Sequence, residues 1–430
     1  MMADNQAIGL SPCATPGTLC VLGIDLGTTS VKAALVIETE QGQIVAQSCS
    51  RETQAQADSL AAGAQGMEQD VQRIIKALNE CLAAFPREHL QRVSRIGISG
   101  QMHGVVFWKT NQGCKWAKSG TGHTFQPGEV SHLITWQDGR CSSSFLSSLP
   151  QPQSHLSLAT GFGCTTIYWY LKNSLRESGF PLDLLPEVGD PGDIAGRMSH
   201  DWHGIPKGTE VGIALGDFQC SVYSCMTERT DAVLNISTSA QLTVPMPLGF
   251  QPPETPDSLS AVAYFPYFDG NYLAVAASLN GGNVLATFVD MLARWMAELG
   301  YEVLESNVYT QMINAALAQN DTRLSICPTV FGERHMPEQL ASVTSITASD
   351  LSLGHVTRAL CHGIIQNLHS MLPFQHLKEA GVKRILGSGS ALSKNEVLKQ
   401  EVEKIFPFPV IYGKDVDAAV GAAMVMLHRR

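Results

Sequence analysis

The sequence predicts two α/β domains, and three observations indicate this fold class. The chain has 430 residues, which exceeds the usual size of a single hydrophobic core. Strand-like apolar runs alternate with segments of helical periodicity, which is typical of α/β domains. A strand, a hydroxyl-rich turn and a second strand occur near the start of the chain and recur in its second half. This echo suggests two related halves.

The first half is expected to hold a loose extension at 1–20 and a first domain at 21–229. An amphipathic helix is expected at 68–82, because Val71, Ile74 and Leu78 recur at helical spacing. The strands expected in this half are 20–25, 31–37, 44–47, 93–99, 105–108 and 211–215.

The second half is expected to form a second domain at 230–430. Ser393 is a plausible N-cap for one helix, and a last helix rich in small residues opens at Asp417. The other elements expected here are strands at 233–236, 241–244 and 382–386 and helices at 283–299, 308–318 and 353–372.

Composition excludes several classes of protein. A formal net charge of −10 argues against nucleic acid or an anionic membrane as a partner. No apolar run is long enough to cross a bilayer, and no signal peptide is expected in the first twenty residues. The eleven cysteines are scattered without zinc-site spacing, so reduced thiols in the cytosol are expected.

The turn after the first strand combines Gly27 with the hydroxyls of Thr28, Thr29 and Ser30, and Asp25 precedes it. Glycine permits close backbone approach, and hydroxyls beside exposed N–H groups suit phosphate oxygens. A carboxylate at this place suits the Mg²⁺ that accompanies a nucleotide phosphate. From this segment alone, an ordinary β-hairpin with a polar tip explains the pattern almost equally well.

Two further hydroxyl-and-glycine turns follow strands, at Ser237–Ser239 and at Gly387–Ser390. Each is a candidate phosphate or nucleotide contact. The chain contains neither a GxxxxGK[ST] loop nor a complete GxGxxG fingerprint, which argues against a P-loop enzyme and a dinucleotide-binding protein.

Asp217 follows an expected strand and precedes an expected helix. A general base and a helix N-cap are equally well supported for it, and the two roles are compatible. If the reaction is phosphoryl transfer, positioning and charge neutralisation contribute more than the base.

Two polar segments are candidates for holding a polyol. One contains Gln101, Met102 and His103, and the other contains Trp136, Asp138 and Arg140. Amide, carboxylate and guanidinium groups bind sugar hydroxyls, and an indole stacks on the carbon face. The alternatives are a core histidine in a turn and a solvated loop with an ion pair.

These segments, in this order, resemble the FGGY carbohydrate kinases, relatives of glycerol kinase and xylulokinase with the actin-like ATPase (ribonuclease H-like) fold. The resemblance covers nearly the whole chain, and its Gln-Met-His-Gly segment favours a ketose kinase over a glycerol kinase. The sequences of residues 105–108 and 277–283 most resemble the branch of the family that phosphorylates sedoheptulose for the pentose phosphate pathway. The motifs that carry the resemblance are 23–32, 100–104, 136–140, Gly216-Asp217, 332–334, 387–390 and 417–423.

The resemblance implies two domains that close over ATP and sugar, with the sugar and the catalytic base on the first domain and ATP on the second. It makes Asp217 the base and places Asp25 and Asp217 near Mg²⁺. A monomer or a weak homodimer is expected. The implied ligand contacts are Thr28, Thr29, Ser237, Thr238, Gly387, Ser388, Gly389 and Asn395 for ATP, and Gln101, Met102, His103, Asp138 and Arg140 for the sugar.

The chain departs from the family pattern at two places. Phe218 stands where family members often have a second polar residue after the base. A segment of several dozen residues is also missing, with a join near Ser174, so the first domain is expected to be shortened. The resulting hypotheses are an active ketose kinase, for sedoheptulose or, like xylulokinase, for another ketose, and an ATP-binding variant with an impaired sugar site. A third, a filament or chaperone ATPase, rests on fold analogy alone.

Overall fold

The computed structural model describes residues 19–40, 42–120, 122–175, 185–226, 228–257, 259–336, 338–413 and 416–428. The chain divides into two compact units, which we call unit 1 and unit 2. The division falls after Ser224, and the chain returns to unit 1 at Asp417. The boundary expected near Thr230 thus lies a few residues further along the chain than the observed division.

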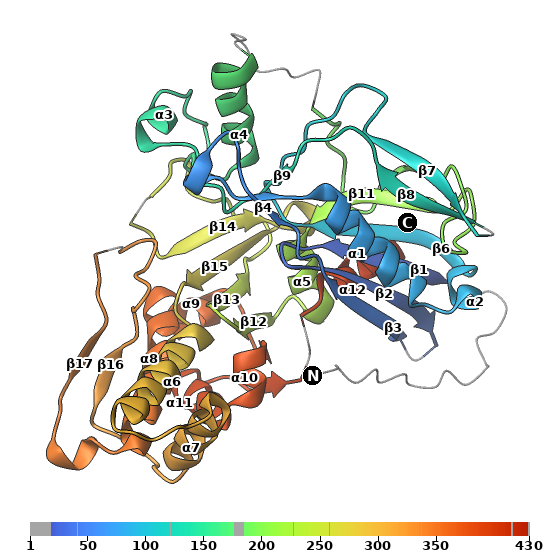
Figure 1. The fold of residues 1–430 in the computed structure, drawn as a ribbon. Coiled ribbons are helices and arrows are strands. Elements are labelled where there is room, and N and C mark those ends of the chain that lie inside the picture. Colours follow the sequence, from blue (N-terminus) through green and yellow to red (C-terminus); the bar gives the residue numbers. More distant parts are fainter. Residues whose placement is uncertain are drawn as a thin grey trace. The chain divides into compact units, whose positions relative to one another are not determined.

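Unit 1 is built on a mixed six-stranded sheet (Figure 1). In spatial order its strands are β10 (Ile194–Arg197), β11 (Glu210–Gly216), β6 (Val93–Gly100), β1 (Cys20–Leu26), β2 (Ser30–Thr39) and β3 (Gly42–Glu52). β1 and β3 each pair antiparallel with β2, whereas β6 is parallel to both β1 and β11. The carboxyl ends of β1, β6 and β11 therefore meet at one edge of the sheet.

Two helices cover opposite faces of this sheet. Leu22 and Ile24 of β1 belong to the same buried cluster as α1 (Val71–Ala83), whereas Val21 packs with α12 (Ala418–His428). Successive side chains of a strand point to opposite faces, so α1 and α12 lie on either side of the sheet. Unit 1 therefore has three layers.

The last helix, α12, packs on unit 1 although the sequence places it in the second domain. A Cβ built on Gly23 would lie 1.8 Å from the carbonyl oxygen of Ala419, and one on Gly97 would lie 2.2 Å from that of Ala422. Only strands with glycine at these positions admit a helix so closely. The run of small residues in α12 matches these glycines and explains its attachment to unit 1.

The rest of unit 1 connects these elements. A small three-stranded sheet and a two-stranded hairpin belong to it, and the hairpin packs against α1. These elements are β4 (Gln56–Ala57), β5 (Glu68–Gln69), β9 (Leu133–Ile134), β7 (Cys114–Ser119), β8 (Gly122–Pro127), α2 (Arg87–Leu90), α3 (Ser143–Ser147), α4 (Gly163–Tyr170), a π-helical turn at Leu171–Leu175 and α5 (Asp217–Cys225).

Unit 2 repeats the sheet of unit 1. In spatial order its strands are β14 (Val262–Pro266), β15 (Tyr272–Ser278), β13 (Ala240–Pro245), β12 (Asp231–Ile236), β18 (Arg384–Ser388) and β19 (Val410–Tyr412). β13 pairs antiparallel with β12 and β15, and β18 is parallel to β12 and β19. This is the connectivity of β1, β2, β3, β6 and β11, so the relation between the halves suggested by the echo is confirmed.

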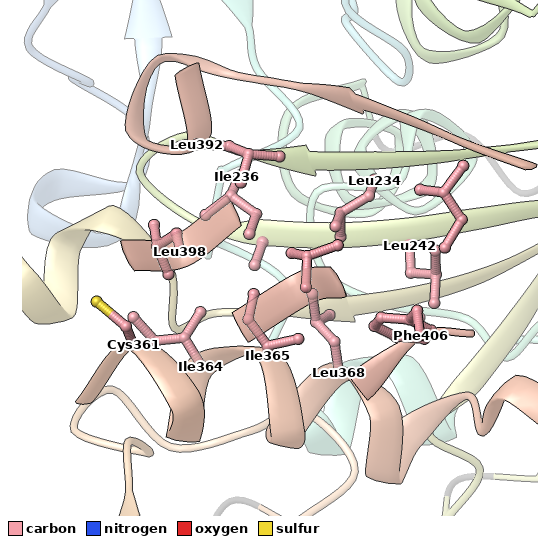
Figure 2. Packing of buried hydrophobic residues seen from close by; sticks show 14 of the residues in the cluster. Leu234, Ile236, Leu242, Cys361, Ile364, Ile365, Leu368, Leu392, Leu398 and Phe406 are labelled. Atoms are coloured by element: carbon pink, nitrogen blue, oxygen red, sulfur yellow. The ribbon is translucent and has the colours of Figure 1, made fainter. Parts of the chain in front are cut away.

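The core of unit 2 lies between its sheet and α8 (Leu353–Met371). Figure 2 shows Leu234 and Ile236 of β12 pointing toward Ile364 and Leu368 of α8, all of them buried. The other elements of this unit are α6 (Gly282–Glu298), α7 (Glu305–Leu317), α9 (Phe374–Glu379), α10 (Ser390–Lys394), α11 (Glu396–Ile405), β16 (Ser325–Cys327) and β17 (Ser342–Thr344).

One predicted helix begins later than expected, and two local predictions are wrong. The helix expected at 68–82 begins at Val71, because the Asp70 side chain accepts a hydrogen bond from the Gln72 N–H and caps it. The segment 105–108 forms isolated bridges rather than a strand. The N-cap expected at Ser393 is Asn395, whose Oδ1 accepts hydrogen bonds from two backbone N–H groups of α11.

The described residues include no helix that is long and apolar enough to cross a membrane. More than half of the cysteines in the described part of the chain are buried.

Glu401 of α11 is a buried carboxylate that links two helices of unit 2. It is 1% exposed and accepts hydrogen bonds from Arg358 Nη1 at 2.5 Å, His362 Nδ1 at 2.9 Å and Lys404 Nζ at 2.9 Å. Burial opposes its charge, but the bonds from these three donors outweigh it and lower its pKa to about 2.

Glu401→Ala is therefore expected to reduce the free energy of unfolding by about 3–5 kcal/mol at pH 7, because it leaves the buried Arg358 without its ion-pair partner. A lowered folded-state pKa stabilises the fold above the unfolded-state pKa and loses that effect as the pH falls toward 2. Denaturant titrations at pH 7 and pH 3 should give a smaller difference from wild type at pH 3. The exposed Glu379→Gln serves as the control, and equal differences at both pH values would contradict the prediction.

Candidate active site

Asp25 lies at the carboxyl edge of the unit 1 sheet, beside Ser99 of β6. It is 7% exposed, and Ser99 Oγ donates a hydrogen bond to its Oδ1 at 3.1 Å. Burial and the charges of Asp217 and Asp417 raise its pKa to about 6, against the opposing effects of Ser99 and Lys32. Asp25 is therefore a buried acid among other acids.

Asp217 is the first residue of α5, directly after β11. Its Oδ1 accepts a hydrogen bond from the Phe218 N–H at 2.7 Å, and burial raises its pKa above the ordinary value. This bond engages only one carboxylate oxygen, so the base role and the helix-start role of Asp217 are compatible, and the base role stays a prediction.

Asp417 is the third acid near Asp25, and the sequence analysis noted it only as a helix start. Its Oδ1 caps α12 by accepting hydrogen bonds from Ala419 N at 2.8 Å and Val420 N at 3.1 Å. Its proximity to Asp25 follows from the packing of α12 on unit 1, which no local pattern indicates.

The acids at this edge fit a divalent cation bound together with substrate. Asp25, Asp217 and Asp417 concentrate negative charge there. In the described part of the chain, no three His, Cys, Asp or Glu side chains are close enough together to hold a metal ion by themselves. Mg²⁺ commonly uses one or two carboxylates, water and substrate phosphates, so this donor set suits it.

The turn between β1 and β2 carries Thr28 and Thr29 beside Asp25. Thr28 Oγ1 accepts a hydrogen bond from Trp136 Nε1 at 3.1 Å, and Thr29 is exposed. The Thr28 carbonyl accepts a second bond from Gln69 Nε2 at 2.6 Å. Trp136 and Gln69 thus hold this turn in place. The hydroxyl hydrogens of Thr28 and Thr29 remain available for a ligand.

Gln69 is a site residue that the sequence analysis missed. Besides its bond to Thr28, its Oε1 accepts a hydrogen bond from Gln101 Nε2 at 3.2 Å. Gln69 therefore connects the turn at Thr28, which is expected to bind phosphate, to the segment at Gln101, which is expected to bind sugar. Because the helix expected from residue 68 includes Gln69, it concealed this role.

Gln101, Met102 and His103 follow β6. No donor among the described residues reaches the buried Gln101 Oε1. Met102 lies against Gly216, since a Cβ there would be 3.0 Å from the Met102 sulfur. This contact places the segment next to Asp217.

His103 has a positive φ of 65° and stacks on Phe162, with ring centroids 4.4 Å apart and 10° between the planes. Partial burial lowers its pKa. Since the side chain is also partly exposed, His103 presents a largely neutral imidazole at the surface.

Asp138 and Arg140 differ from the expected sugar contacts because their side chains have no exposed surface. Arg140 donates to Asp138 at 2.7 Å, to Glu68 at 2.8 Å and to the Tyr170 hydroxyl at 2.8 Å. Asp138 also accepts from the Met67 N–H at 2.8 Å. In this structure the pair holds the surrounding loops together.

The turn at Ser237–Ser239 lies between β12 and β13, as the turn at 27–29 lies between β1 and β2. Its backbone carbonyls accept hydrogen bonds from α6, at 2.8 Å for Gly282 N to Ser237 O and 3.0 Å for Asn283 N to Thr238 O. Thr238 and Ser239 are exposed. The turn is fixed by its backbone and presents the hydroxyls of Thr238 and Ser239, whereas Ser237 Oγ donates to Asn235 Oδ1 at 3.4 Å and accepts from Ser390 N at 3.3 Å.

The segment after β18 carries the remaining expected ATP contacts. Gly389 has a φ of 100°, and a Cβ there would lie 2.3 Å from the Ile236 carbonyl oxygen. Ser388 is buried, and a Cβ on Gly387 would strike the Tyr412 ring at 2.6 Å. Asn395 is fully buried and caps α11, so its side chain lies in the core rather than at a ligand surface.

Comparison with known proteins identifies relatives over most of the chain. A model for the N-terminal domain of the FGGY family of carbohydrate kinases matches residues 20–174. Sedoheptulokinase from Mus musculus is 61% identical over 95% of this chain and 97% of its own length. The Homo sapiens protein of the same name is 60% identical over the same shares.

Solved structures of sugar kinases share the fold. Xylulose kinase from Rhodospirillum rubrum superposes with a TM-score of 0.74 at 16% identity, covering 95% of this chain and 89% of that one. Plasmodium falciparum glycerol kinase with ADP gives 0.68 at 14% identity, with the same coverage. The expected actin-like two-domain fold of carbohydrate kinases is therefore confirmed.

The comparisons also bear on the join expected near Ser174. The family match ends at residue 174. The comparison with the mouse protein extends over 462 residues, more than the 430 of this chain, so the mouse protein has residues where this chain has none.

The extent of these similarities shows to which family the chain belongs. The identity to two curated relatives is well above 30% and spans nearly all of each relative. The motif order, the repeated sheet and the matched domain agree with it. This chain belongs to the FGGY family of carbohydrate kinases.

Proposed function

We propose that this chain transfers the terminal phosphoryl group of ATP to a ketose, with sedoheptulose as substrate and sedoheptulose 7-phosphate and ADP as products. The observation that carries this proposal is the 61% identity, over 95% of the chain, to a relative named sedoheptulokinase. Xylulose kinase of Escherichia coli is 30% identical over only 34% of the chain, which favours the seven-carbon sugar over xylulose.

Asp217 is the proposed base, and it acts on the sugar hydroxyl that attacks the phosphorus. Phe218 N fixes one oxygen of its carboxylate, which leaves the other to accept the proton. Its raised pKa favours proton acceptance near neutral pH.

Phosphate binding is proposed for the hydroxyl turns of both units. In unit 1 these are Thr28 and Thr29, and in unit 2 Ser237 and Thr238, whereas the adenosine contacts are assigned to 387–389. Mg²⁺ bound with ATP would neutralise charge on the transferred group, and Asp25 and Asp217 are the carboxylates placed to hold it.

Sugar binding is proposed for Gln101, Met102 and His103. A sugar hydroxyl is the donor that the buried Gln101 Oε1 lacks among the described residues. Asp138 and Arg140 are proposed to act by holding the loops beside Glu68 and Met67 rather than by touching sugar. The reduced thiols fit the cytoplasm, and a monomer or weak homodimer stays our expectation.

An ADP-release assay with Mg-ATP and a panel of ketoses tests the proposal. We expect turnover with sedoheptulose, and mass spectrometry should find one phosphate added to the sugar. The absence of ADP release with every ketose would contradict the proposed activity.

The shortened first domain favours a second candidate, an ATP-binding protein with an impaired sugar site. Thermal unfolding separates the two, because a ligand that binds only the folded state raises the midpoint. A midpoint raised by sedoheptulose supports the kinase. A midpoint raised by ATP but not by any ketose supports the impaired form.

A further inference from the structure

Glu333 is a buried carboxylate of unit 2 to which the proposed chemistry assigns no role. It is 1% exposed, and in the described part of the chain no lysine or arginine lies within ion-pair distance of it. Its Oε1 accepts hydrogen bonds from Ser278 Oγ at 2.5 Å, Asn280 Nδ2 at 2.9 Å and Asn367 Nδ2 at 2.7 Å. A buried charge held by neutral donors is costly, so its placement calls for an explanation.

The groups that Glu333 binds belong mainly to one short segment, Ser278 to Asn280. Glu333 Oε2 also accepts from the Leu279 N–H at 3.3 Å. Asn280 is itself fully buried and bonds the Gly332 carbonyl at 2.8 Å and the Phe331 N–H at 3.1 Å. The segment after β15 is therefore fixed to the loop that carries Glu333.

This segment runs directly into the N-terminus of α6, which holds the turn at Ser237–Ser239. A Cβ on Gly281 would lie 2.5 Å from Ser239, and one on Gly282 would lie 2.5 Å from the Ser237 carbonyl oxygen. Gly282 N and Asn283 N donate to the carbonyls of Ser237 and Thr238. These two N–H groups are already used, so they fix the turn and leave the exposed Thr238 hydroxyl for a ligand.

We propose that Glu333 is a positioning residue for the terminal phosphate of ATP. It holds Ser278–Asn280, this segment holds the start of α6, and α6 holds the turn that carries Ser237 and Thr238. This inference rests on the proposed phosphate contacts of that turn. Glu333 touches neither substrate, and its effect is confined to the position of the turn.

The test compares Glu333→Ala with Glu333→Gln. We expect Glu333→Ala to weaken binding of Mg²⁺ and the non-hydrolysable analogue AMP-PNP by about 10- to 100-fold, because a small displacement of positioned groups has effects of this size. ADP, which lacks the terminal phosphate, should lose much less affinity, and the KM for the ketose should stay unchanged. Glu333→Gln keeps the acceptor for Ser278, Asn280 and Asn367, so its affinity should stay within about threefold of wild type.

Glu401→Ala is the matched control, since it removes another buried carboxylate of the same unit. It should lower the unfolding midpoint without changing either nucleotide affinity. Equal affinity of Glu333→Ala and wild type for AMP-PNP, or equal losses for AMP-PNP and ADP, would overturn the inference. If Glu333→Ala does not fold, Glu333→Asp takes its place, because it shortens the side chain by one carbon. Its affinities for AMP-PNP and ADP then test the inference in the same way. A wild type that binds AMP-PNP but phosphorylates no ketose refutes the proposed function, and the affinities still decide the role of Glu333.

Discussion

Asp217→Asn is expected to lower kcat for ketose phosphorylation by about 10²- to 10⁴-fold, the usual contribution of a general base. The amide keeps an oxygen that can accept the Phe218 N–H, so the start of α5 should stay intact. The lost property is the ability to take the proton of the sugar hydroxyl. Steady-state assays with saturating Mg-ATP and sedoheptulose measure this change.

The control for charge alone is Asp58→Asn, which removes a carboxylate from an exposed position of unit 1. It should leave kcat within about twofold of wild type, since exposed substitutions have small effects. Circular dichroism should show both variants folded. Full activity of Asp217→Asn would remove Asp217 from the proposed mechanism.

The echo between the two halves was visible in the sequence because both turns join strands with buried apolar side chains. Asp25 pairs with Lys32 and Ser99, and Asn235 occupies the corresponding place, paired with Gln241 and Ser388. The sheets are thus equivalent, whereas the carboxylate is present only in unit 1. This difference supports assigning the acid chemistry to unit 1.

Local patterns did not reveal which polar residues are buried. Asp138 and Asn395 are residue types that bind ligands and that also cap or bridge loops, and only the tertiary structure places them in the core. Gln69 and Glu333, in contrast, have contacts near the proposed site that the sequence did not indicate. Each acts through segments distant in sequence, such as Thr28 for Gln69 and Asn280 for Glu333, and periodicity carries no information about such contacts.

Asp25→Asn is expected to lower activity by about 10²-fold or more, as the loss of one preorganised electrostatic group usually does, and to make the protein more stable. Burial and the nearby charges of Asp217 and Asp417 raise the pKa of Asp25 from 3.8 to about 6. A rise of about two pKa units corresponds to about 3 kcal/mol of destabilisation when the group is charged. The amide removes this charge and keeps an acceptor for Ser99 Oγ.

The sign of the effect on stability follows from linkage. Because the folded protein binds the Asp25 proton more tightly than the unfolded chain, the fold loses stability as the pH rises through about 6. The gain from Asp25→Asn, about 1–3 kcal/mol at pH 7.5, should therefore vanish below about pH 4, where the wild-type group is protonated in both states. Denaturant unfolding at the two pH values measures it.

Asp231→Asn provides the contrasting variant, because Asp231 is also buried but accepts hydrogen bonds from Arg384 at 2.6 and 3.1 Å. Removing the carboxylate from this ion pair should destabilise unit 2, although the Arg384 side chain is 29% exposed and keeps Glu228 nearby. Opposite signs for the two substitutions would show that Asp25 lacks a compensating cation in the free protein. A loss of stability in both variants would mean that the Asp25 carboxylate stabilises the fold. The three acids of unit 1 would then no longer indicate a binding site for a cation that arrives with ATP.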